Sequence, residues 1–296
     1  MPLTQLDHKI AQLKKLYSEG KLIPFIGSGL SYPFDIPTWE GLIKELLCYV
    51  PDKLQPSIEF DLETHDYWSA VDNIKKYANF SEFEVQEKVK DLIENRVKKE
   101  VNIEDHNYGD LGKMKFNTFL TTNYDDLLYQ YLEGEKYYPI DLSSATVKST
   151  ELHNTDRKKR IWHLHGSLSN TGSIVLSREG YKQVYSQEKY RTLFSTLLGN
   201  NTLLFLGFSF EDQYIKQLIK DYKPYFNNTH YILLSNPSAE RIRELKEECG
   251  LEVIPLYIKD STRVKEIRKL LQAIDLHQTS TNTSMHSSEA NELKKK

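Results

Sequence analysis

Small and polar residues follow five apolar segments that have the composition of buried strands. A histidine among them can act as a general base near neutral pH, and an asparagine offers a donor and an acceptor together. In open α/β sheets, ligands bind beyond the carboxyl ends of the strands. We therefore expect the five small and polar segments that follow these strands to meet at one site. They are Gly27-Ser28-Gly29-Leu30-Ser31, Thr122-Asn123-Tyr124-Asp125, His165-Gly166, Gly207-Phe208-Ser209 and Ser235-Asn236.

The first segment is a glycine loop directly after the apolar run Leu22–Ile26. Glycines after a strand allow backbone N–H groups to approach a pyrophosphate without a Cβ in the way. The loop does not read GxGxxG, because position 32 is Tyr, and the chain has no GKS or GKT triplet of a P-loop. Taken alone, the loop is explained equally well as a plain turn.

Two histidines, His163 and His165, alternate in a predicted strand, so both side chains should point the same way. An HxH pair can bind a metal, but no third ligand is evident. Because Gly166 follows it directly, we favour His165 as the catalytic histidine. Asn123-Tyr124-Asp125 could also cap the helix that follows, a role compatible with catalysis.

Strand and helix patterns alternate along most of the chain. Repeated β-then-α units predict an α/β fold with a doubly wound, mostly parallel, Rossmann-like sheet. The expected strands are Leu22–Ile26, Phe116–Thr121, Arg160–His165, Ile174–Leu176, Thr202–Leu206, His230–Leu234 and Glu252–Pro255. The expected helices cover the first 20 residues, a segment from Trp39 with Thr38 as N-cap, Tyr67–Tyr77, Phe83–Val97, a segment from Tyr124, Phe210–Asp221, Ser238–Cys249 and Ser261–Ile274.

The chain is expected to form one domain over residues 1–276 with a helical insert at about 51–113. The insert is charged and has a helical period, unlike the strand–helix alternation around it. Residues 277–296 are rich in Ser, Thr and Asn without periodicity, and we predict that they are disordered.

The composition excludes several classes of protein. A net charge of −3, from 39 basic and 42 acidic residues, provides no global field for nucleic acid or anionic lipid. The two cysteines, Cys48 and Cys249, cannot form a four-cysteine zinc site and read as reduced thiols. No apolar run reaches the roughly 20 residues of a spanning helix, and the N-terminus lacks a signal peptide. We therefore expect a cytoplasmic protein with no membrane or direct nucleic-acid partner.

The motifs carry a family likeness. In order, GSGLS, TTNYD, HG and GFS resemble the GAGxS, TQNxD, HG and GTS signatures of the sirtuins, over residues 22 to about 257. Asn236 is similar in place to the sirtuin asparagine near the adenine ribose. The PFIGSGLS, IPTW, TTNYD and LHGSL segments resemble more closely a zinc-free bacterial branch found in anti-phage defence NAD hydrolases.

Two departures separate the chain from the deacylating sirtuins. Those proteins carry a four-cysteine zinc ribbon after the HG motif, whereas only about seven residues separate Gly166 from Ile174 here. Their IPDFR segment is replaced by Ile36-Pro37-Thr38-Trp39, which lacks the arginine. A protein deacylase is therefore disfavoured.

The resemblance implies an NAD glycohydrolase that cleaves NAD to nicotinamide and ADP-ribose, with NAD as substrate and no metal. Its transition state would be oxocarbenium-like. His165 would act as general base, Asn123 would hold water and ribose hydroxyls, and Asp125 would bind the nicotinamide carboxamide. The remaining residues expected to surround NAD are Gly27, Ser28, Gly29, Ser31, Thr122, Gly207, Ser209 and Asn236.

Other functions and partners stay open. The chain could be a zinc-free deacylase or an ADP-ribosyltransferase, or a module that senses NAD or ADP-ribose without turnover. As the NAD-depleting effector of an anti-phage system it would require control. We expect that control to come from a homo-oligomer or from a separate sensor, such as a HerA-type ATPase.

Overall fold

A computed structural model describes residues 4–132, 137–144, 148–153, 158–209, 213–259 and 261–275. Its described strands form one seven-stranded sheet in the order β3-β4-β2-β1-β5-β6-β7, with every neighbouring pair parallel. The strands are β1 (Leu22–Ile26), β2 (Thr118–Thr121), β3 (Tyr137–Asp141), β4 (Lys159–His163), β5 (Thr202–Leu206), β6 (His230–Ser235) and β7 (Leu251–Leu256). The expected doubly wound α/β sheet is thus confirmed.

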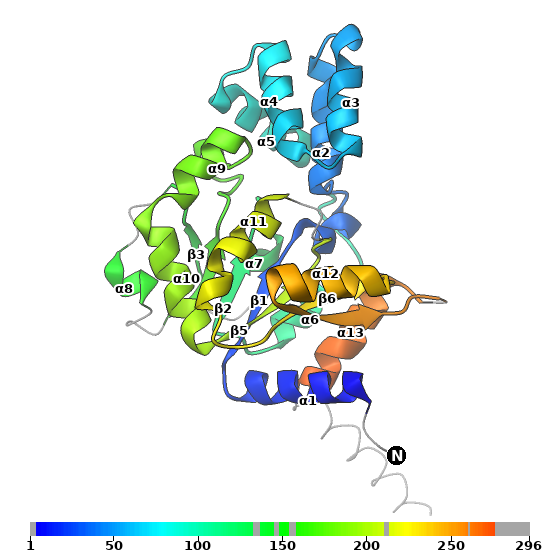
Figure 1. Cartoon of the computed structure of the whole chain (residues 1–296), viewed down its shortest axis with the longest axis vertical. Coiled ribbons are helices and arrows are strands. Elements are labelled where there is room, and N and C mark those ends of the chain that lie inside the picture. The colour runs from blue at the N-terminus through cyan, green and yellow to red at the C-terminus, as the bar shows by residue number, and fades with distance from the viewer. Residues whose placement is uncertain are drawn as a thin grey trace, which may run out of the picture.

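Helices lie on both faces of the sheet and beyond one end of it (Figure 1). In Figure 1, α2 to α5 gather above the carboxyl end of the sheet, and α1 crosses the opposite end. The helices are α1 (Gln5–Ser18), α2 (Trp39–Leu46), α3 (Gln55–Glu63), α4 (Tyr67–Ala78), α5 (Glu82–Arg96), α6 (Tyr108–Lys113), α7 (Leu127–Tyr131), α8 (Ser149–Leu152), α9 (Arg178–Tyr185), α10 (Glu188–Asn200), α11 (Gln213–Tyr222), α12 (Ala239–Cys249) and α13 (Arg263–Ile274).

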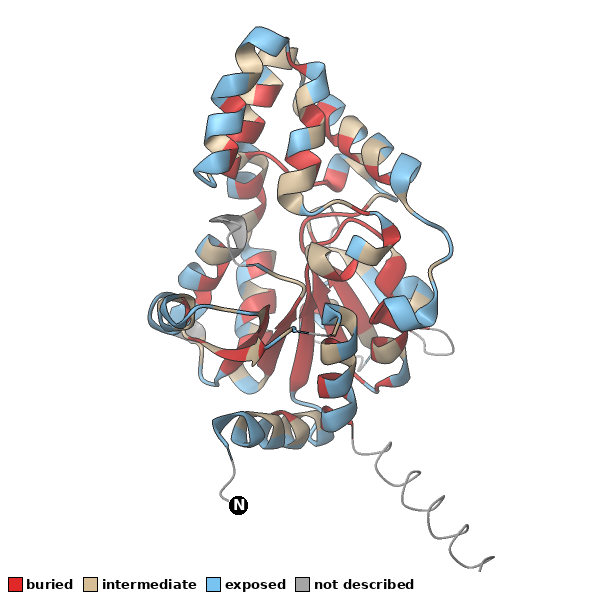
Figure 2. Ribbon diagram, turned by 90° about the vertical axis from the view of Figure 1, so that its right-hand side faces the viewer, coloured by how far each residue is buried: buried red, intermediate tan, exposed pale blue. Residues whose placement is uncertain are grey.

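Two apolar cores flank the sheet, because successive strand residues point to opposite faces. In β5, Leu204 and Leu206 join the core shared with α1, α6, α7 and α13, whereas Leu203 and Phe205 join the core of α9 to α12. Both faces of the central strands are therefore buried, as Figure 2 shows in red. This explains their continuous apolar composition.

Helix α2 begins with the N-cap residue that the sequence predicts. Thr38 caps it, since its hydroxyl oxygen accepts a hydrogen bond from the Gly41 N–H at 3.3 Å. The helix expected from Tyr124 begins three residues later, at Leu127, whose N–H bonds to the Asp125 carboxylate at 3.1 Å. Residues 123–126 form a loop instead.

The strand predicted at Ile174–Leu176 is wrong. The segment is buried but irregular: the N–H groups of Ile174 and Val175 donate to the carbonyls of Thr171 and His165, and side chains satisfy two of its carbonyls. The Gln86 amide donates to the Ile174 carbonyl at 2.6 Å, and the Tyr124 hydroxyl donates to the Val175 carbonyl at 2.8 Å. A buried apolar triplet was mistaken for a strand.

The edge strand β3 was not predicted. Its sequence contains Pro139, and Tyr138 is exposed, so it lacks the apolar run of a central strand. Proline is tolerated at such an edge. Helices α9 and α10 were also not predicted. Residues 210–212, at the start of the expected Phe210–Asp221 helix, and the tail 277–296 lie outside the described residues.

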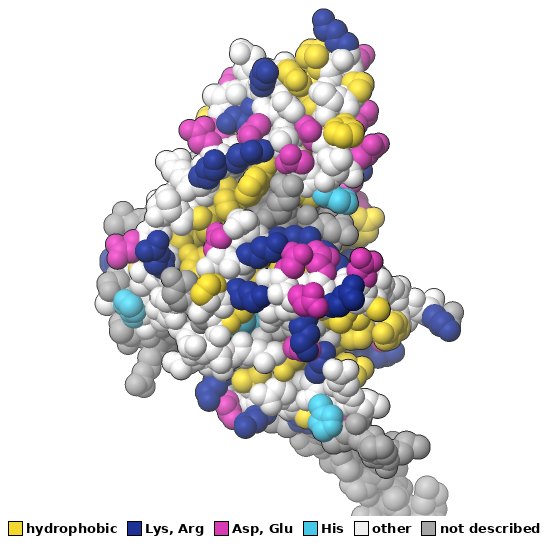
Figure 3. Space-filling model, viewed as in Figure 1, with side chains coloured by type: hydrophobic (Ala, Val, Ile, Leu, Met, Phe, Trp, Pro, Cys, Tyr) yellow, Lys and Arg dark blue, Asp and Glu magenta, His cyan; other side chains and the backbone are white. Residues whose placement is uncertain are grey.

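The described surface is dominated by paired charges. On the face shown in Figure 3, basic and acidic side chains lie side by side over α12. Ion pairs account for this pattern, such as Lys216 with Glu244 at 2.9 Å and Lys246 with Glu252 at 2.8 Å. No described helix is both long and apolar enough to cross a membrane.

Candidate active site

A cavity of about 660 Å³ opens at the carboxyl edge of the sheet, where sequence reasoning placed the site. Because the strands are parallel, the loops after β1, β2, β4, β5 and β6 all contribute to its wall. The predicted site residues that line it are Ser28, Gly29, Thr122, Asn123, Asp125, His165, Gly207, Ser209 and Asn236. Gly27 and Ser31 do not line it.

Three glycines explain how the loops after β1 and β5 meet. The Gly29 N–H donates to the Gly207 carbonyl at 2.9 Å, and a Cβ on Gly29 or on Gly27 would lie 2.8 Å from that oxygen. Gly207 itself has a φ of 78°, a region that other residues rarely adopt. The glycines are therefore required by close backbone contact, in addition to any approach of a phosphate.

Asn123 is held by a buried hydrogen-bond network. Its amide nitrogen donates to the Ser31 hydroxyl at 3.0 Å and to the Tyr108 hydroxyl at 3.3 Å. Ser31 in turn donates to the Asp125 carboxylate at 2.8 Å. The side-chain oxygen Oδ1 of Asn123 is buried and has no partner among the described residues. The network fixes the carboxamide of this cavity-lining residue and leaves its acceptor oxygen unpaired.

Tyr108 was missed by sequence reasoning. It begins α6, inside the expected insert, and lies 2.7 Å from the Ser31 hydroxyl. It is wholly buried, and burial together with the Asp125 charge raises the pKa of its hydroxyl well above the usual value, so it remains protonated. No local pattern distinguishes it from the chain's other tyrosines.

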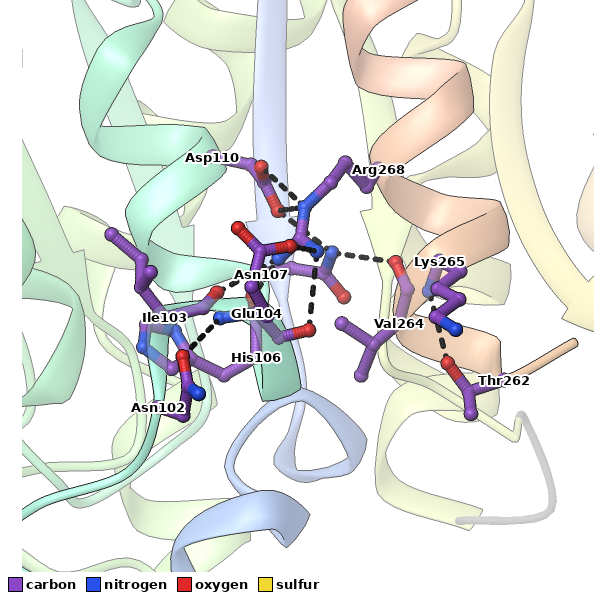
Figure 4. Close-up of polar contacts among 10 residues, drawn as sticks. All are labelled: Asn102, Ile103, Glu104, His106, Asn107, Asp110, Thr262, Val264, Lys265 and Arg268. Atoms are coloured by element: carbon purple, nitrogen blue, oxygen red, sulfur yellow. Dashed lines mark hydrogen bonds and ion pairs between the residues drawn. The ribbon is translucent and has the colours of Figure 1, made fainter.

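Arg268 on α13 holds the segment that carries Tyr108 (Figure 4). Its guanidinium bonds to Asp110 at 2.9 Å, to the Glu104 carboxylate at 2.7 Å and to the His106 carbonyl at 2.9 Å. Five guanidinium N–H donors can satisfy several acceptors at once. The placement of Tyr108, and through it of Asn123, thus depends on a contact with the last described helix.

Asp125 is a buried carboxylic acid at the cavity wall. Burial raises its pKa to about 6, although the hydrogen bonds from Ser31 and from the Leu127 N–H favour the ionised form. The Leu127 contact caps α7, so the capping role considered for this segment falls to Asp125. The capping interaction does not involve the side chain of Asn123.

His165 reaches the cavity from the loop after β4 and is 7% exposed. Its Nε2 lies 2.7 Å from the Tyr185 hydroxyl of α9, and the Tyr181 ring meets the imidazole edge-on. Burial lowers the pKa of His165 to about 3, so its imidazole is neutral at physiological pH. Tyr185 was not predicted, because α9 itself was missed.

His163 faces the protein interior and does not line the cavity. Its Nδ1 lies 3.2 Å from the Asn123 backbone carbonyl, and burial lowers its pKa. Strand β4 ends at His163, so the expected alternation does not extend to His165. The described residues contain no cluster of three or more His, Cys, Asp or Glu side chains that could hold a metal ion.

Asn236 lies at the opposite end of the cavity, after β6. Its φ is 47°, and its side-chain carbonyl accepts from the Ile258 N–H at 2.9 Å. The carboxamide therefore already links the loops after β6 and β7. Next to it, Arg263 and Arg241 line the cavity, and neither was predicted.

A parallel sheet with a glycine-lined cavity at its carboxyl edge is the arrangement in which open α/β sheets bind their ligands. Residues 117–254 match the family model of the SIR2-like domain. Residues 117–254 are therefore similar to a SIR2-like domain, and the sheet that holds them is Rossmann-like.

Two curated proteins are similar in sequence to most of this chain. The chain is 26% identical over 235 residues to NAD(+) hydrolase ThsA of Acinetobacter baumannii (strain 532279), covering 76% of the chain and 44% of that protein. It is 24% identical over 286 residues to the protein of the same name from Enterococcus faecium, covering 94% of the chain and 55% of that protein. The chain spans about half the length of these relatives.

Proposed function

We propose that the protein is an NAD glycohydrolase that converts NAD and water to nicotinamide and ADP-ribose. The observation that carries the proposal is the side-chain oxygen Oδ1 of Asn123, a buried acceptor without a partner among the described residues, on a residue that lines the same cavity as His165. Such a group is costly unless a ligand or water completes its hydrogen bond. The names of the relatives, NAD(+) hydrolase, support the same assignment.

The reaction requires a water, a base and stabilisation of positive charge. Water oxygen bonds to C1′ of the nicotinamide ribose as the C1′–N bond breaks, and the bonding pair stays on the nicotinamide nitrogen. Asn123 accepts a hydrogen bond from the water or a ribose hydroxyl, and neutral His165 takes the released proton. Burial lowers the pKa of His165 and keeps its imidazole neutral, the form that can accept the proton.

The remaining predicted ligands take the other parts of NAD. Backbone and hydroxyl groups of Ser28, Gly29, Gly207 and Ser209 surround the phosphates, Thr122 flanks the nicotinamide ribose, and Asp125 binds the carboxamide. Gly27 acts by permitting the loop contact, and Ser31 acts by orienting Asn123 and Asp125. Asn236 lines the cavity at the adenosine end, where its side-chain oxygen accepts a hydrogen bond from the Ile258 N–H.

In the cell we propose a cytoplasmic, NAD-depleting effector of anti-phage defence, kept inactive until triggered. The control we propose is a homo-oligomer or a separate sensor such as a HerA-type ATPase. Residues 1–276 would act as one catalytic domain, with the helices of residues 51–113 as an insert. Support comes from the relatives' names and from the risk that an unregulated NADase poses to its host.

One experiment separates the candidate activities. Purified protein is incubated with NAD, alone and with its genomic neighbour, and products are identified by mass spectrometry beside a His165→Ala control. Free ADP-ribose and nicotinamide in equal amounts, absent with the control, support hydrolysis. O-acyl-ADP-ribose or modified protein would indicate a transferase. Binding of NAD without products under both conditions would indicate a sensing module.

A further inference from the structure

The wall of the cavity is not uniform in charge. Among its described lining residues, the carboxylates are Glu40 of α2 and Asp125 after β2. The guanidinium groups, Arg241 of α12 and Arg263 of α13, both lie at the β6 end. A ligand in this cavity therefore meets positive charge at the end farthest along the sheet from Asn123.

Arg263 is the arginine with unused donors. Its Nε donates to the Ser235 hydroxyl, the last residue of β6, at 3.1 Å. No described residue accepts a hydrogen bond from its two terminal nitrogens. Arg241, in contrast, is engaged by Glu244 at 2.5 Å and by the Ser209 carbonyl at 3.1 Å. Arg263 is an exposed residue that lines the cavity, and its terminal N–H groups form a planar fork of the kind that suits a phosphate.

The sheet sets the distance between the two ends. From β2, which precedes Asn123, to β6, which precedes Asn236, the order β2-β1-β5-β6 gives three strand spacings. At about 4.8 Å each, this is roughly 14 Å. A dinucleotide cleaved at the nicotinamide ribose beside Asn123, with its pyrophosphate at the glycine loops, places its adenosine ribose beside Ser235 and Arg263.

The protein residue that lies against the 2′-hydroxyl of that ribose decides whether the site takes NAD or NADP. Rossmann-type sites that select NAD over NADP place a carboxylate against the 2′-hydroxyl, and those that accept NADP place an arginine there. Here the described lining of the β6 end offers Arg263 and no carboxylate. We propose that Arg263 binds a 2′-phosphate on the adenosine ribose, so that the protein takes NADP as well as NAD. This inference rests on the proposed function.

The test uses products, which bind without turnover. Affinities of the full chain for ADP-ribose and for ADP-ribose 2′-phosphate are measured by titration calorimetry at two salt concentrations. We expect the phosphorylated ligand to bind at least as tightly, with the steeper salt dependence. Arg263→Ala should weaken it roughly 10-fold or more and leave ADP-ribose within about twofold, since a charge-assisted pair is lost. Arg263→Lys should recover part of the loss.

Arg243→Ala is the matched control, because Arg243 is an exposed arginine of α12 that does not line the cavity. It should change neither affinity. In parallel, NADP should yield nicotinamide and ADP-ribose 2′-phosphate, with Arg263→Ala lowering kcat/KM for NADP only.

Three results would overturn the inference. ADP-ribose binding without binding of the 2′-phosphate form would remove the phosphate site and leave the proposed function intact. Equal weakening of both ligands by Arg263→Ala would place Arg263 at the pyrophosphate instead. Failure of both ligands to bind would reject the cavity as a dinucleotide site, and the proposed function with it.

Discussion

The Nε2 atom of His165 lies 2.7 Å from the hydroxyl oxygen of Tyr185, so the imidazole is fixed by a residue of α9 rather than by a carboxylate. The Tyr185 ring also stacks on Tyr181 with centroids 4.2 Å apart. The histidine therefore has a rigid apolar and aromatic support. The proposed catalytic roles can be tested at this contact and at four other features of the site.

Tyr185→Phe should retain the fold and the ring stacking but release the imidazole. We expect kcat for NAD cleavage to fall about 10-fold with little change in KM, since orientation of the base affects the transition state most. Tyr32→Phe, at a tyrosine 66% exposed, is the control and should be silent. A rise in kcat for Tyr185→Phe would instead show that the hydroxyl obstructs His165.

His165→Ala should lower NAD cleavage about 100-fold or more while NAD binding and the melting temperature stay near wild type. His163→Ala should act differently. Its ring contacts the Asn123 backbone inside the protein, so we expect lost stability in thermal melts and a smaller loss of activity. Wild-type turnover in His165→Ala would remove the catalytic assignment.

Asn123→Ala and Asn123→Asp should both abolish most NAD cleavage, because neither supplies a donor and an acceptor together. They should differ in stability. The Asp variant places a second buried carboxylate beside Ser31 and Asp125, so it should melt lower than the Ala variant at pH 7.5. Lowering the pH protonates one of the two carboxylates and should reduce the difference in melting temperature between the two variants. Melting curves of both variants at pH 7.5 and pH 5 measure this, and retained activity in either would return Asn123 to a structural role.

The raised pKa of Asp125 predicts a pH dependence with a definite sign. The folded pKa of about 6 exceeds the ordinary value of 3.8, so the penalty that ionisation of Asp125 imposes on folding builds up between pH 3.8 and pH 6 and is complete above pH 6. Relative to Asp125→Asn, the wild type should gain about 1 kcal/mol of unfolding free energy between pH 7.5 and pH 5. Urea unfolding at the two pH values measures the gain. An unchanged difference would show that Asp125 ionises freely.

Removal of metal should leave the activity unchanged. The mechanism proposed for Asn123 and His165 uses no metal, so exhaustive treatment with EDTA should not alter NAD cleavage. Parallel assays with added zinc complete the measurement. Activity lost in EDTA and restored by zinc would show that His163 and His165 act as a metal pair after all.

The sequence alone was sufficient to predict the central strands of the sheet and the residues that follow them at its carboxyl edge. Short apolar runs such as Thr202–Leu206 are diagnostic because both faces of a central parallel strand are buried. Edge strand β3 escaped prediction because its half-exposed residues carry no such run. Ile174–Leu176 shows the converse, since side chains from Gln86 and Tyr124 can satisfy a buried backbone as a strand would.

The supporting residues of the site could not be predicted. Tyr108 and Tyr185 reach Asn123 and His165 through tertiary contacts, and a tyrosine that makes such a contact is locally indistinguishable from one that does not. Arg263 lies inside the predicted helix Ser261–Ile274 and is the first residue of α13, and only the fold brings it to the cavity. Motifs identified the residues proposed to react, whereas the residues that hold them required the fold.

The contact of Gly27 and Gly29 with Gly207 limits how this cavity can change. Because even a methyl group on Gly27 or Gly29 would meet the Gly207 carbonyl at 2.8 Å, neither position can accept a side chain unless the loop after β5 moves as well. We therefore expect variation in ligand size or preference at the other walls, which are α2 on one side and the β6 end on the other. A laboratory library aimed at new dinucleotide substrates should leave the glycines untouched and diversify those walls.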